Sequence, residues 1–224
     1  MSSSTALGSE MGNGDKVVNF IFNHTNSFTG TVSTPTSTPT LALQYSNIRR
    51  LLSSVTVSTA VASVNFTSLI TNQFRHYILE FDSVFPITNN NYAQYRLSQN
   101  NGSTWIADYV MEVWGHEGAT DSLAQTGAFF TRSNMNSDAW GLPNSATNPR
   151  TPLNGFIYMV NPNSTVGFKA CRGEVVHGLS AATDYTMNET FSSFARVAGA
   201  VNAIQFLFNS GNIASGNFRF YGIN

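Results

Sequence analysis

The stretch at residues 74–105, FRHYILEFDSVFPITNNNYAQYRLSQNNGSTW, decides the fold of this 224-residue chain. Near its beginning, alternate positions form two sets, of which the first is mainly apolar and the second carries charge. The first set is Tyr77, Leu79, Phe81, Ser83 and Phe85, and the second is His76, Glu80 and Asp82. Such period-two alternation predicts a half-buried antiparallel strand. Pro86 ends this strand because it has no amide hydrogen for the ladder.

A second strand is predicted after the turn-forming residues 88–91. Its inward residues are Ala93, Tyr95 and Leu97, and its outward residues are Gln94, Arg96 and Ser98. If the two strands form a simple hairpin, Arg96 lies opposite Glu80 or Asp82 on the exposed face. Opposite charges across strands contribute about 0.2–1 kcal/mol. The stretch therefore predicts antiparallel β structure and offers no catalytic chemistry.

The rest of the chain also reads as strands. Candidate strands lie at residues 16–23, 55–62, 64–70, 106–114, 125–131, 153–161, 165–177, 190–198, 201–208 and 216–221. The NPNS sequence at 161–164 is a strong turn signal and predicts a second hairpin. No amphipathic helix of useful length is expected. About ten strands at roughly 8–12-residue spacing predict an all-β, antiparallel β-sandwich, with a jelly roll as the expected topology.

An extended N-terminal arm is expected before the sandwich. Residues 1–15 are rich in Ser and Gly, and residues 28–40 form a Thr/Pro/Ser stretch typical of an extended linker. An arm of this composition becomes ordered only when something holds it. We therefore expect an arm and linker at 1–40, packed on a neighbouring molecule, and a β-sandwich domain at 41–224.

Composition and charge disfavour several classes of function. Charged residues are only 10% of the chain, so Asn, Ser, Thr and Gly must cover much of its surface, as suits assembled extracellular or virion proteins. The net charge is −1, and Arg49-Arg50 is the only adjacent basic pair. Binding several phosphates needs clustered Lys and Arg, so no nucleic-acid partner is expected.

Membrane insertion, signal-directed secretion and disulfide bonding are not expected either. No apolar run approaches the roughly 20 residues of a membrane helix, and the N-terminal sequence lacks the pattern of a signal peptide. Cys171 is the single cysteine, which excludes an internal disulfide framework. It lies in a strand-like run, where we expect a buried structural thiol.

The residues with catalytic or metal-binding chemistry do not form a recognisable site. Glu80 and Asp82 lie about 7 Å apart on one strand face, a range that could serve glycoside hydrolysis, but a solvated face paired with Arg96 is the favoured interpretation. The histidines are isolated, and the loop with His116, Glu117 and Asp121 offers too few ligands for a metal. No serine-nucleophile or phosphate-binding motif occurs. We expect no enzyme activity, no cofactor and no metal.

Two tryptophans are the candidate contact residues. Trp105 follows a polar turn and Trp140 lies in a long Asn/Pro/Gly loop at 134–150. Either indole could stack on a sugar ring of a host glycan, although packing in the core or between subunits is the commoner role of such residues.

Three stretches resemble a domain family recurrent in structural proteins of tailed bacteriophages. They are HYILEFDSVFPITNN at 76–90, YRLSQNNGSTW at 95–105 and GNFRFYGIN at 216–224. In that family a strand with a characteristic aromatic and Pro pattern precedes a strand that ends in a double-glycine turn, and the domain closes on a "YG" strand. This sequence has Asn-Asn-Gly-Ser-Thr at 100–104 in place of the double glycine. The match covers about residues 55–224.

The resemblance implies a jelly-roll-like module displayed on the virion, in a tail fibre, a tail tip or a capsid decoration. We therefore expect a non-enzymatic virion structural protein, assembled in the host bacterial cytoplasm as a homotrimer that binds other virion proteins. Two alternatives remain open: a module that binds a host surface glycan, and a glycan-degrading enzyme that depends on Glu80 or Asp82.

Overall fold

The computed structural model divides the chain into two units, Met1–Ile48 and Arg49–Asn224. The backbone is described at residues 28–33, 40–45, 49–88, 91–118, 128–133, 152–180 and 183–224, and side chains at 49–88, 91–113, 152–178 and 188–224. The predicted strand at 16–23, Trp140 and Asp121 lie outside the described residues.

The first unit contains a two-stranded antiparallel ladder. β1 (Phe28–Ser33) pairs with β2 (Thr40–Tyr45), with Phe28 opposite Tyr45 and Ser33 opposite Thr40. The Thr/Pro/Ser stretch at 28–40 thus begins with a paired strand, whereas its sequence predicts an extended linker. Thr and Val at its first positions suit a strand, because β-branched side chains fit the pleated backbone.

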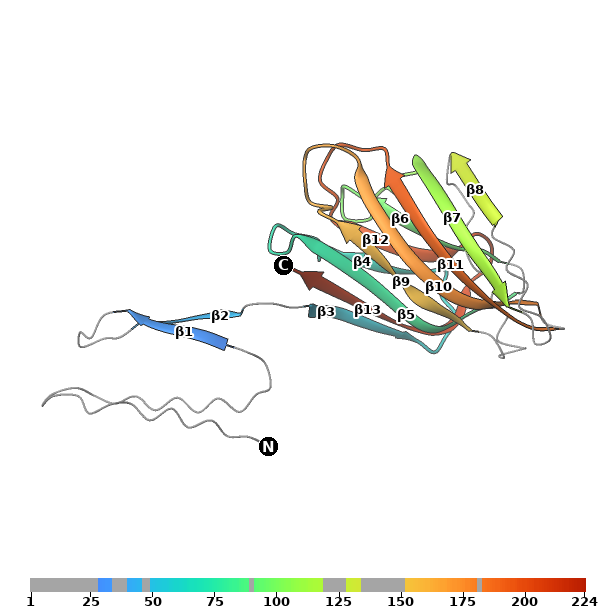
Figure 1. Cartoon of the computed structure of the whole chain (residues 1–224), viewed down its shortest axis with the longest axis horizontal. Coiled ribbons are helices and arrows are strands. Elements are labelled where there is room, and N and C mark those ends of the chain that lie inside the picture. Colours follow the sequence, from blue (N-terminus) through green and yellow to red (C-terminus); the bar gives the residue numbers. More distant parts are fainter. Residues whose placement is uncertain are drawn as a thin grey trace, which may run out of the picture. The chain divides into compact units, whose positions relative to one another are not determined.

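The second unit consists of two antiparallel sheets (Figure 1). The larger sheet has eight strands, which are, from edge to edge, β3 (Arg50–Val57), β13 (Ile213–Ile223), β5 (His76–Pro86), β9 (Leu153–Val160), β10 (Lys169–Ser180), β11 (Thr183–Ala195), β7 (Tyr109–Gly118) and β8 (Ala128–Ser133). The smaller sheet has the order β4 (Ser63–Thr67), β12 (Ala203–Phe208) and β6 (Ala93–Ser98). Within the described residues every element is a strand.

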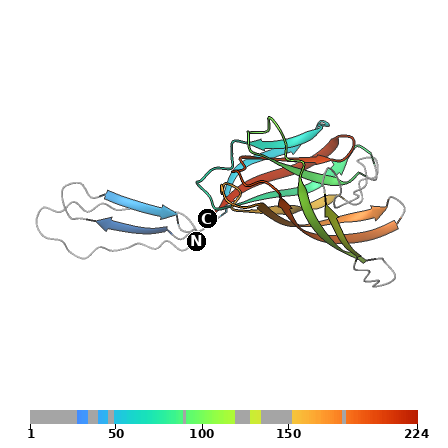
Figure 2. The same cartoon turned by 90° about the horizontal axis from the view of Figure 1, so that it is seen from above.

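Aromatic side chains fill the space between the two sheets. Phe66 on β4 stacks on Phe220 on β13 with 5.2 Å between ring centroids, and Phe206 on β12 lies 5.0 Å from Phe81 on β5. Tyr95 on β6 lies 6.1 Å from Phe191 on β11, so the small sheet contacts both halves of the large one. The sheets lie against each other as two layers (Figure 2). The predicted all-β sandwich is confirmed. The jelly-roll topology is not confirmed, because the sheets hold eight and three strands.

The two strands of the 74–105 stretch form where the sequence predicts them, but they do not pair with each other. β5 lies between β13 and β9 in the large sheet, and β6 pairs with β12 in the small one. The connection between them crosses from one sheet to the other and is fixed by two backbone bonds, from Ile87 N to Asn212 O and from Asn209 N to Tyr92 O, each 2.9 Å. The predicted hairpin is therefore wrong.

The alternation of β5 also breaks before its end. Tyr77, Leu79 and Phe81 are buried as predicted, but Ser83 is exposed with φ 54° and Val84 is buried instead. The ladders to β9 and β13 both shift register here, which marks a β-bulge. On β13 the facing residue is Gly216 with φ +151°, where a Cβ would lie 2.7 Å from Cγ2 of Val84. The bulge therefore needs glycine at position 216.

The second predicted hairpin is confirmed. β9 and β10 pair in register, with Ala170 opposite Val160 and Val176 opposite Asn154. In the turn Ser164 N donates to Asn161 O at 3.1 Å, and Asn161 adopts φ 43°, a value that Asn tolerates better than most residues. β12 is buried on both faces as predicted, because it is the central strand of the small sheet.

Candidate functional site

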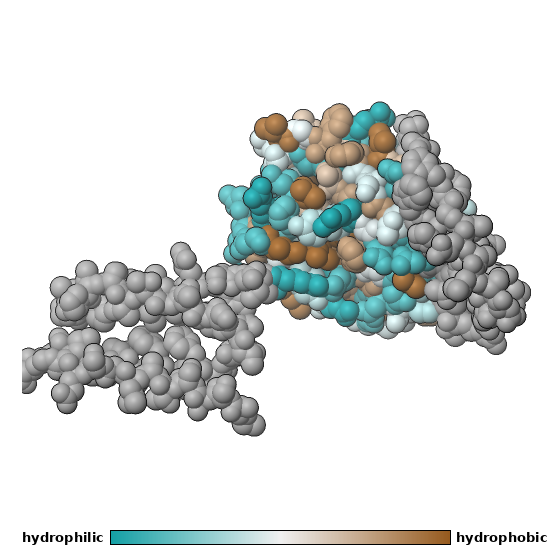
Figure 3. All heavy atoms as spheres, viewed as in Figure 1, coloured by the Kyte–Doolittle hydropathy of each residue, from teal (hydrophilic) through white to brown (hydrophobic). Residues whose placement is uncertain are grey.

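The outer face of the large sheet, which is the face turned away from the small sheet, carries half-buried and exposed side chains on β5, β9, β10 and β11. Two neighbouring rows of ladder partners cross it. One row is His76, Val160, Ala170 and Phe194, and the next is Ile78, Tyr158, Arg172 and Ser192. Phe194 keeps 50% of its surface exposed. Figure 3 shows one side of the second unit, with apolar residues in separate areas among polar ones.

Three side chains drawn from these two ladder rows form a cluster that we call the aromatic–arginine row: His76 on β5, Tyr158 on β9 and Arg172 on β10. The His76 ring stacks on Tyr158 with 5.5 Å between centroids and 29° between planes. The Arg172 Cζ lies 5.0 Å from the centroid of the same ring. Because β9 lies between β5 and β10, at the usual strand spacing of about 4.8 Å, Tyr158 stands between His76 and Arg172. Cation–π attraction holds the guanidinium in place.

His76 enters this row as a neutral imidazole. The backbone N of Asn161 donates to its Nδ1 at 3.4 Å, so Nε2 carries the proton. Burial, and then the nearby charge of Arg75, lower the pKa of His76 below its usual 6.5. At neutral pH the row therefore presents an imidazole N–H, a phenol O–H and a guanidinium.

A charge network occupies the outer face at β3, β13 and β5. Arg219 Nη2 lies 2.6 Å from Asp82 Oδ2, and its Nε lies 3.9 Å from Glu80 Oε2. Arg49 pairs with Glu80 and lies over the Tyr221 ring at 3.8 Å. The hydrogen bond and charge of Glu80 raise the pKa of Arg49. The two carboxylates that could have served hydrolysis are thus bound by arginines.

The arginine that pairs with these carboxylates differs from the predicted one. Arg96 lies on β6 in the small sheet, opposite Gln205, while Glu80 has Arg219 as its ladder partner. Asn217 extends the network, since its Nδ2 donates to Asp82 Oδ1 at 3.0 Å. The sequence shows an acidic strand face, but only the pairing of β5 with the last strand supplies its partner.

Trp105 lies beside the turn that precedes it and is half-buried. Gly102, with φ +85°, approaches the indole so closely that a Cβ there would lie 3.1 Å from Trp105 Cζ2 and 3.2 Å from Thr67 Cγ2. The ring therefore packs over the Gly102 turn. Of Trp140 the structure describes nothing, and of Trp114 it describes only the backbone on β7.

Sequence reasoning missed the aromatic residues of the outer face. The sequence predicts no binding role for Tyr158, Phe194 or the 59%-exposed Phe168. The alternation in the candidate strands at 153–161 and 190–198 carries a signal, because it sets Tyr158 and Phe194 opposite to the buried Met159 and Ala195. It does not reveal that the two residues share one face, which depends on β10 lying between their strands.

The titratable residues Cys171, Tyr95, Tyr109 and Lys169 are buried in the interior of the sandwich. Burial raises the pKa of the Cys171 thiol to about 12, and burial likewise raises the pKa of Tyr95 and Tyr109. Cys171 is thus the buried thiol that its sequence context predicts. Lys169 is only 1% exposed, and its Nζ donates to Gly167 O at 2.8 Å and Ala198 O at 3.3 Å. Burial lowers the pKa of Lys169.

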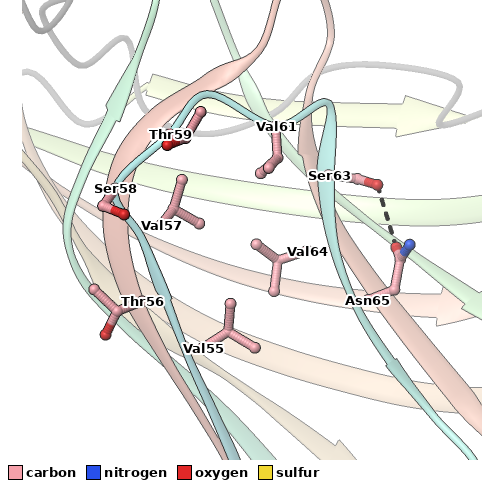
Figure 4. Close-up of a pocket in the computed structure, with 9 residues that line it drawn as sticks. All are labelled: Val55, Thr56, Val57, Ser58, Thr59, Val61, Ser63, Val64 and Asn65. Carbon is pink, nitrogen blue, oxygen red and sulfur yellow. Dashed lines mark hydrogen bonds between the residues drawn. The ribbon is translucent and has the colours of Figure 1, made fainter.

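An open groove lies between β3 and β4, the edge strands of the two sheets (Figure 4). Four valines point into it, Val55, Val57, Val61 and Val64. Its polar residues are uncharged; Ser63 Oγ, for example, donates to Asn65 Oδ1 at 3.3 Å. The groove therefore lacks acid–base groups for catalysis.

No group of three or more His, Cys, Asp or Glu side chains with metal-binding geometry occurs in the part of the chain that the structure describes. His116 and Glu117, which the sequence predicts in a loop, lie instead on strand β7, where only their backbone is described. Over the described ranges no helix is long and apolar enough to span a membrane. Comparison with protein families, curated proteins and solved structures finds no match to this chain.

Proposed function

We propose that the protein is a non-enzymatic structural component of a bacteriophage particle, displayed on the particle surface as a tail- or fibre-associated protein or a capsid decoration. It assembles as a homotrimer in the host bacterial cytoplasm, contacts other virion proteins and is anchored through its N-terminal arm at 1–40. The resemblance of residues 76–90, 95–105 and 216–224 to phage structural proteins supports the virion aspect of this proposal.

The observation that carries the proposal is the broad, exposed outer face of a tightly packed sandwich. The core between the two sheets consists of closely packed aromatic side chains, so the outer face is a rigid surface. Catalytic sites bring free titratable groups together in a concave pocket. On this face Glu80, Asp82, Arg49 and Arg219 bind one another, and exposed apolar residues such as Phe194 lie further across the same sheet, on β11. These properties suit contact with another molecule.

A second candidate function is binding of a host surface glycan, and one specific observation favours it. The outer face holds an exposed aromatic ring, Phe194, near a row of hydrogen-bond donors, His76, Tyr158 and Arg172. Saccharide sites combine aromatic surface with a few placed polar groups. This candidate places the glycan site on the outer face and not at Trp105 and Trp140, the contact residues that the sequence suggests.

The test of the first function is immunogold labelling of intact particles with antibody to this protein. Label spread over the head supports a capsid decoration, and label confined to the tail supports an adsorption component. Particles without label, when labelled again after mild disruption to expose buried epitopes, contradict a virion role. Deletion of residues 1–15 should leave the sandwich folded and reduce incorporation into particles; full incorporation would contradict anchoring by the arm.

A further inference from the structure

We propose that the aromatic–arginine row and the apolar residues beside it bind an acidic saccharide, a sugar chain that carries carboxylate groups. This inference rests on the second candidate function, because it names the ligand class and the residues of that site. It concerns only the outer face at β5, β9, β10 and β11.

The row presents donors in a fixed order across three adjacent strands. Tyr158 stands between His76 at 5.5 Å and Arg172 at 5.0 Å. His76 offers its Nε2–H because Nδ1 faces the Asn161 amide at 3.4 Å. A ligand that satisfies these groups must therefore supply acceptors, as the hydroxyls and carboxylates of a sugar acid do.

Arg172 is the residue that sets the charge of the ligand. Its guanidinium is exposed and stacks on Tyr158, and the described side chains make no ion pair with it. Two acids lie near it in the sheet: Glu174, two residues along its strand, whose Oε1 accepts from Asn188 Nδ2 at 3.0 Å, and Glu112, two strands away in the same ladder row. The guanidinium thus remains open to a carboxylate, which it binds with two parallel hydrogen bonds.

The apolar side of the site lies in the ladder row that begins with His76. Val160, Ala170 and Phe194 are successive ladder partners next to Tyr158 and Arg172. Phe168 precedes Lys169 and is 59% exposed, and Val166 is 80% exposed in the same turn. A pyranose ring has a face of C–H groups that packs on such side chains while its polar substituents reach the donors.

Charge complementarity favours this ligand over a second copy of the chain. Two copies placed face to face about a twofold axis through the row would bring Arg172 against Arg172, and like charges repel. Nucleic acid is also disfavoured, because it needs several clustered cations to bind phosphates. Among the described side chains on or next to β5, β9, β10 and β11, the exposed arginines are Arg75, Arg172 and Arg196, and Arg196 is paired with Asp108.

The experiment measures binding of the full chain to alginate oligosaccharides and to the same oligosaccharides after carboxyl reduction, by calorimetry at low salt. We expect at least about tenfold weaker binding of the reduced form, and a similar loss for Arg172→Ala, since both changes remove the same charge-assisted hydrogen bonds. Arg50→Ala is the matched control, because it removes an exposed arginine from the far edge of the same sheet.

The inference would be overturned by equal binding of acidic and reduced oligosaccharides, by equal losses in Arg172→Ala and Arg50→Ala, or by equal binding of a single-stranded DNA oligomer. Absence of binding to alginate in the parent protein would overturn it too. Thermal unfolding of each variant shows whether it is folded. Immunogold label on particles together with absent binding refutes the saccharide site alone, and binding without label refutes the virion role alone.

Discussion

The ring of Phe191 lies against the backbone of Gly173, its ladder partner on the neighbouring strand. A Cβ at Gly173 would lie 2.3 Å from Phe191 Cε1 and 2.3 Å from the carbonyl oxygen of Phe156. The aromatic ring thus fills the space that a side chain would take, in the middle of the ladder between β10 and β11.

Gly173→Ala should therefore lower the free energy of unfolding by about 1–3 kcal/mol, because the extra methyl group forces the ring and backbone apart. Urea denaturation measures the loss. Gly167→Ala is the control: this glycine has open space around it and φ +72°, so only backbone strain, of order 1 kcal/mol, should appear. Equal losses in both variants would contradict the close packing at Gly173.

The pairing of Asp82 with Arg219 predicts a specific energetic coupling. A double-mutant cycle with Asp82→Ala and Arg219→Ala should give a coupling energy of about 0.2–1 kcal/mol, because both groups are partly exposed. This coupling energy should fall at high salt. The same cycle with Asp82→Ala and Arg96→Ala should give none, since Arg96 lies in the other sheet. Coupling to Arg96 would instead support the simple hairpin.

Cys171 should be unreactive in the folded protein. Burial raises its pKa from 9.0 to about 12, so iodoacetamide at pH 8 should modify it only after unfolding. Rapid modification without denaturant would contradict its burial.

Because the pKa of Cys171 is raised, the protein should become less stable as the pH rises into the alkaline range. Below pH 9 the thiol is protonated in both states, but between pH 9 and 12 it ionises only in the unfolded chain, which favours unfolding as pH rises. At pH 10, ionisation of the Cys171 thiol in the unfolded chain lowers the free energy of unfolding by about 1 kcal/mol. The alkaline loss of stability should therefore be smaller in Cys171→Ala than in the parent, and an identical pH dependence would refute the shift.

Trp105 should contribute to folding more than to ligand binding. Its indole packs over Gly102 and Thr67, so Trp105→Ala should lower stability by about 2 kcal/mol, less than for a fully buried tryptophan. Binding of alginate by the folded variant should equal that of the parent. Loss of binding with unchanged stability would return the glycan site to this turn.

Local patterns in the sequence predict most strands but not their partners. Tyr77, Leu79 and Phe81 mark β5 correctly, because burial of one face is a local property of a strand. The hairpin prediction fails since β5 pairs with β13, which is more than a hundred residues away along the chain. No local pattern encodes such a contact. The outer-face residues Tyr158 and Arg172 become neighbours only through the NPNS hairpin, whose position the sequence did predict.

The ladder that joins the first and last strands of the second unit has a consequence for protein engineering. Arg50 lies opposite Gly222, and the amide of Arg75 donates to Ile223 O at 3.0 Å, so both ends of this unit meet at one place. A short Gly/Ser linker between residues 224 and 49 should permit circular permutation, with new termini opened in the exposed turn at 163–167. For the same reason the sandwich should tolerate insertion into a surface loop of a carrier protein, which would present the outer face without its own arm.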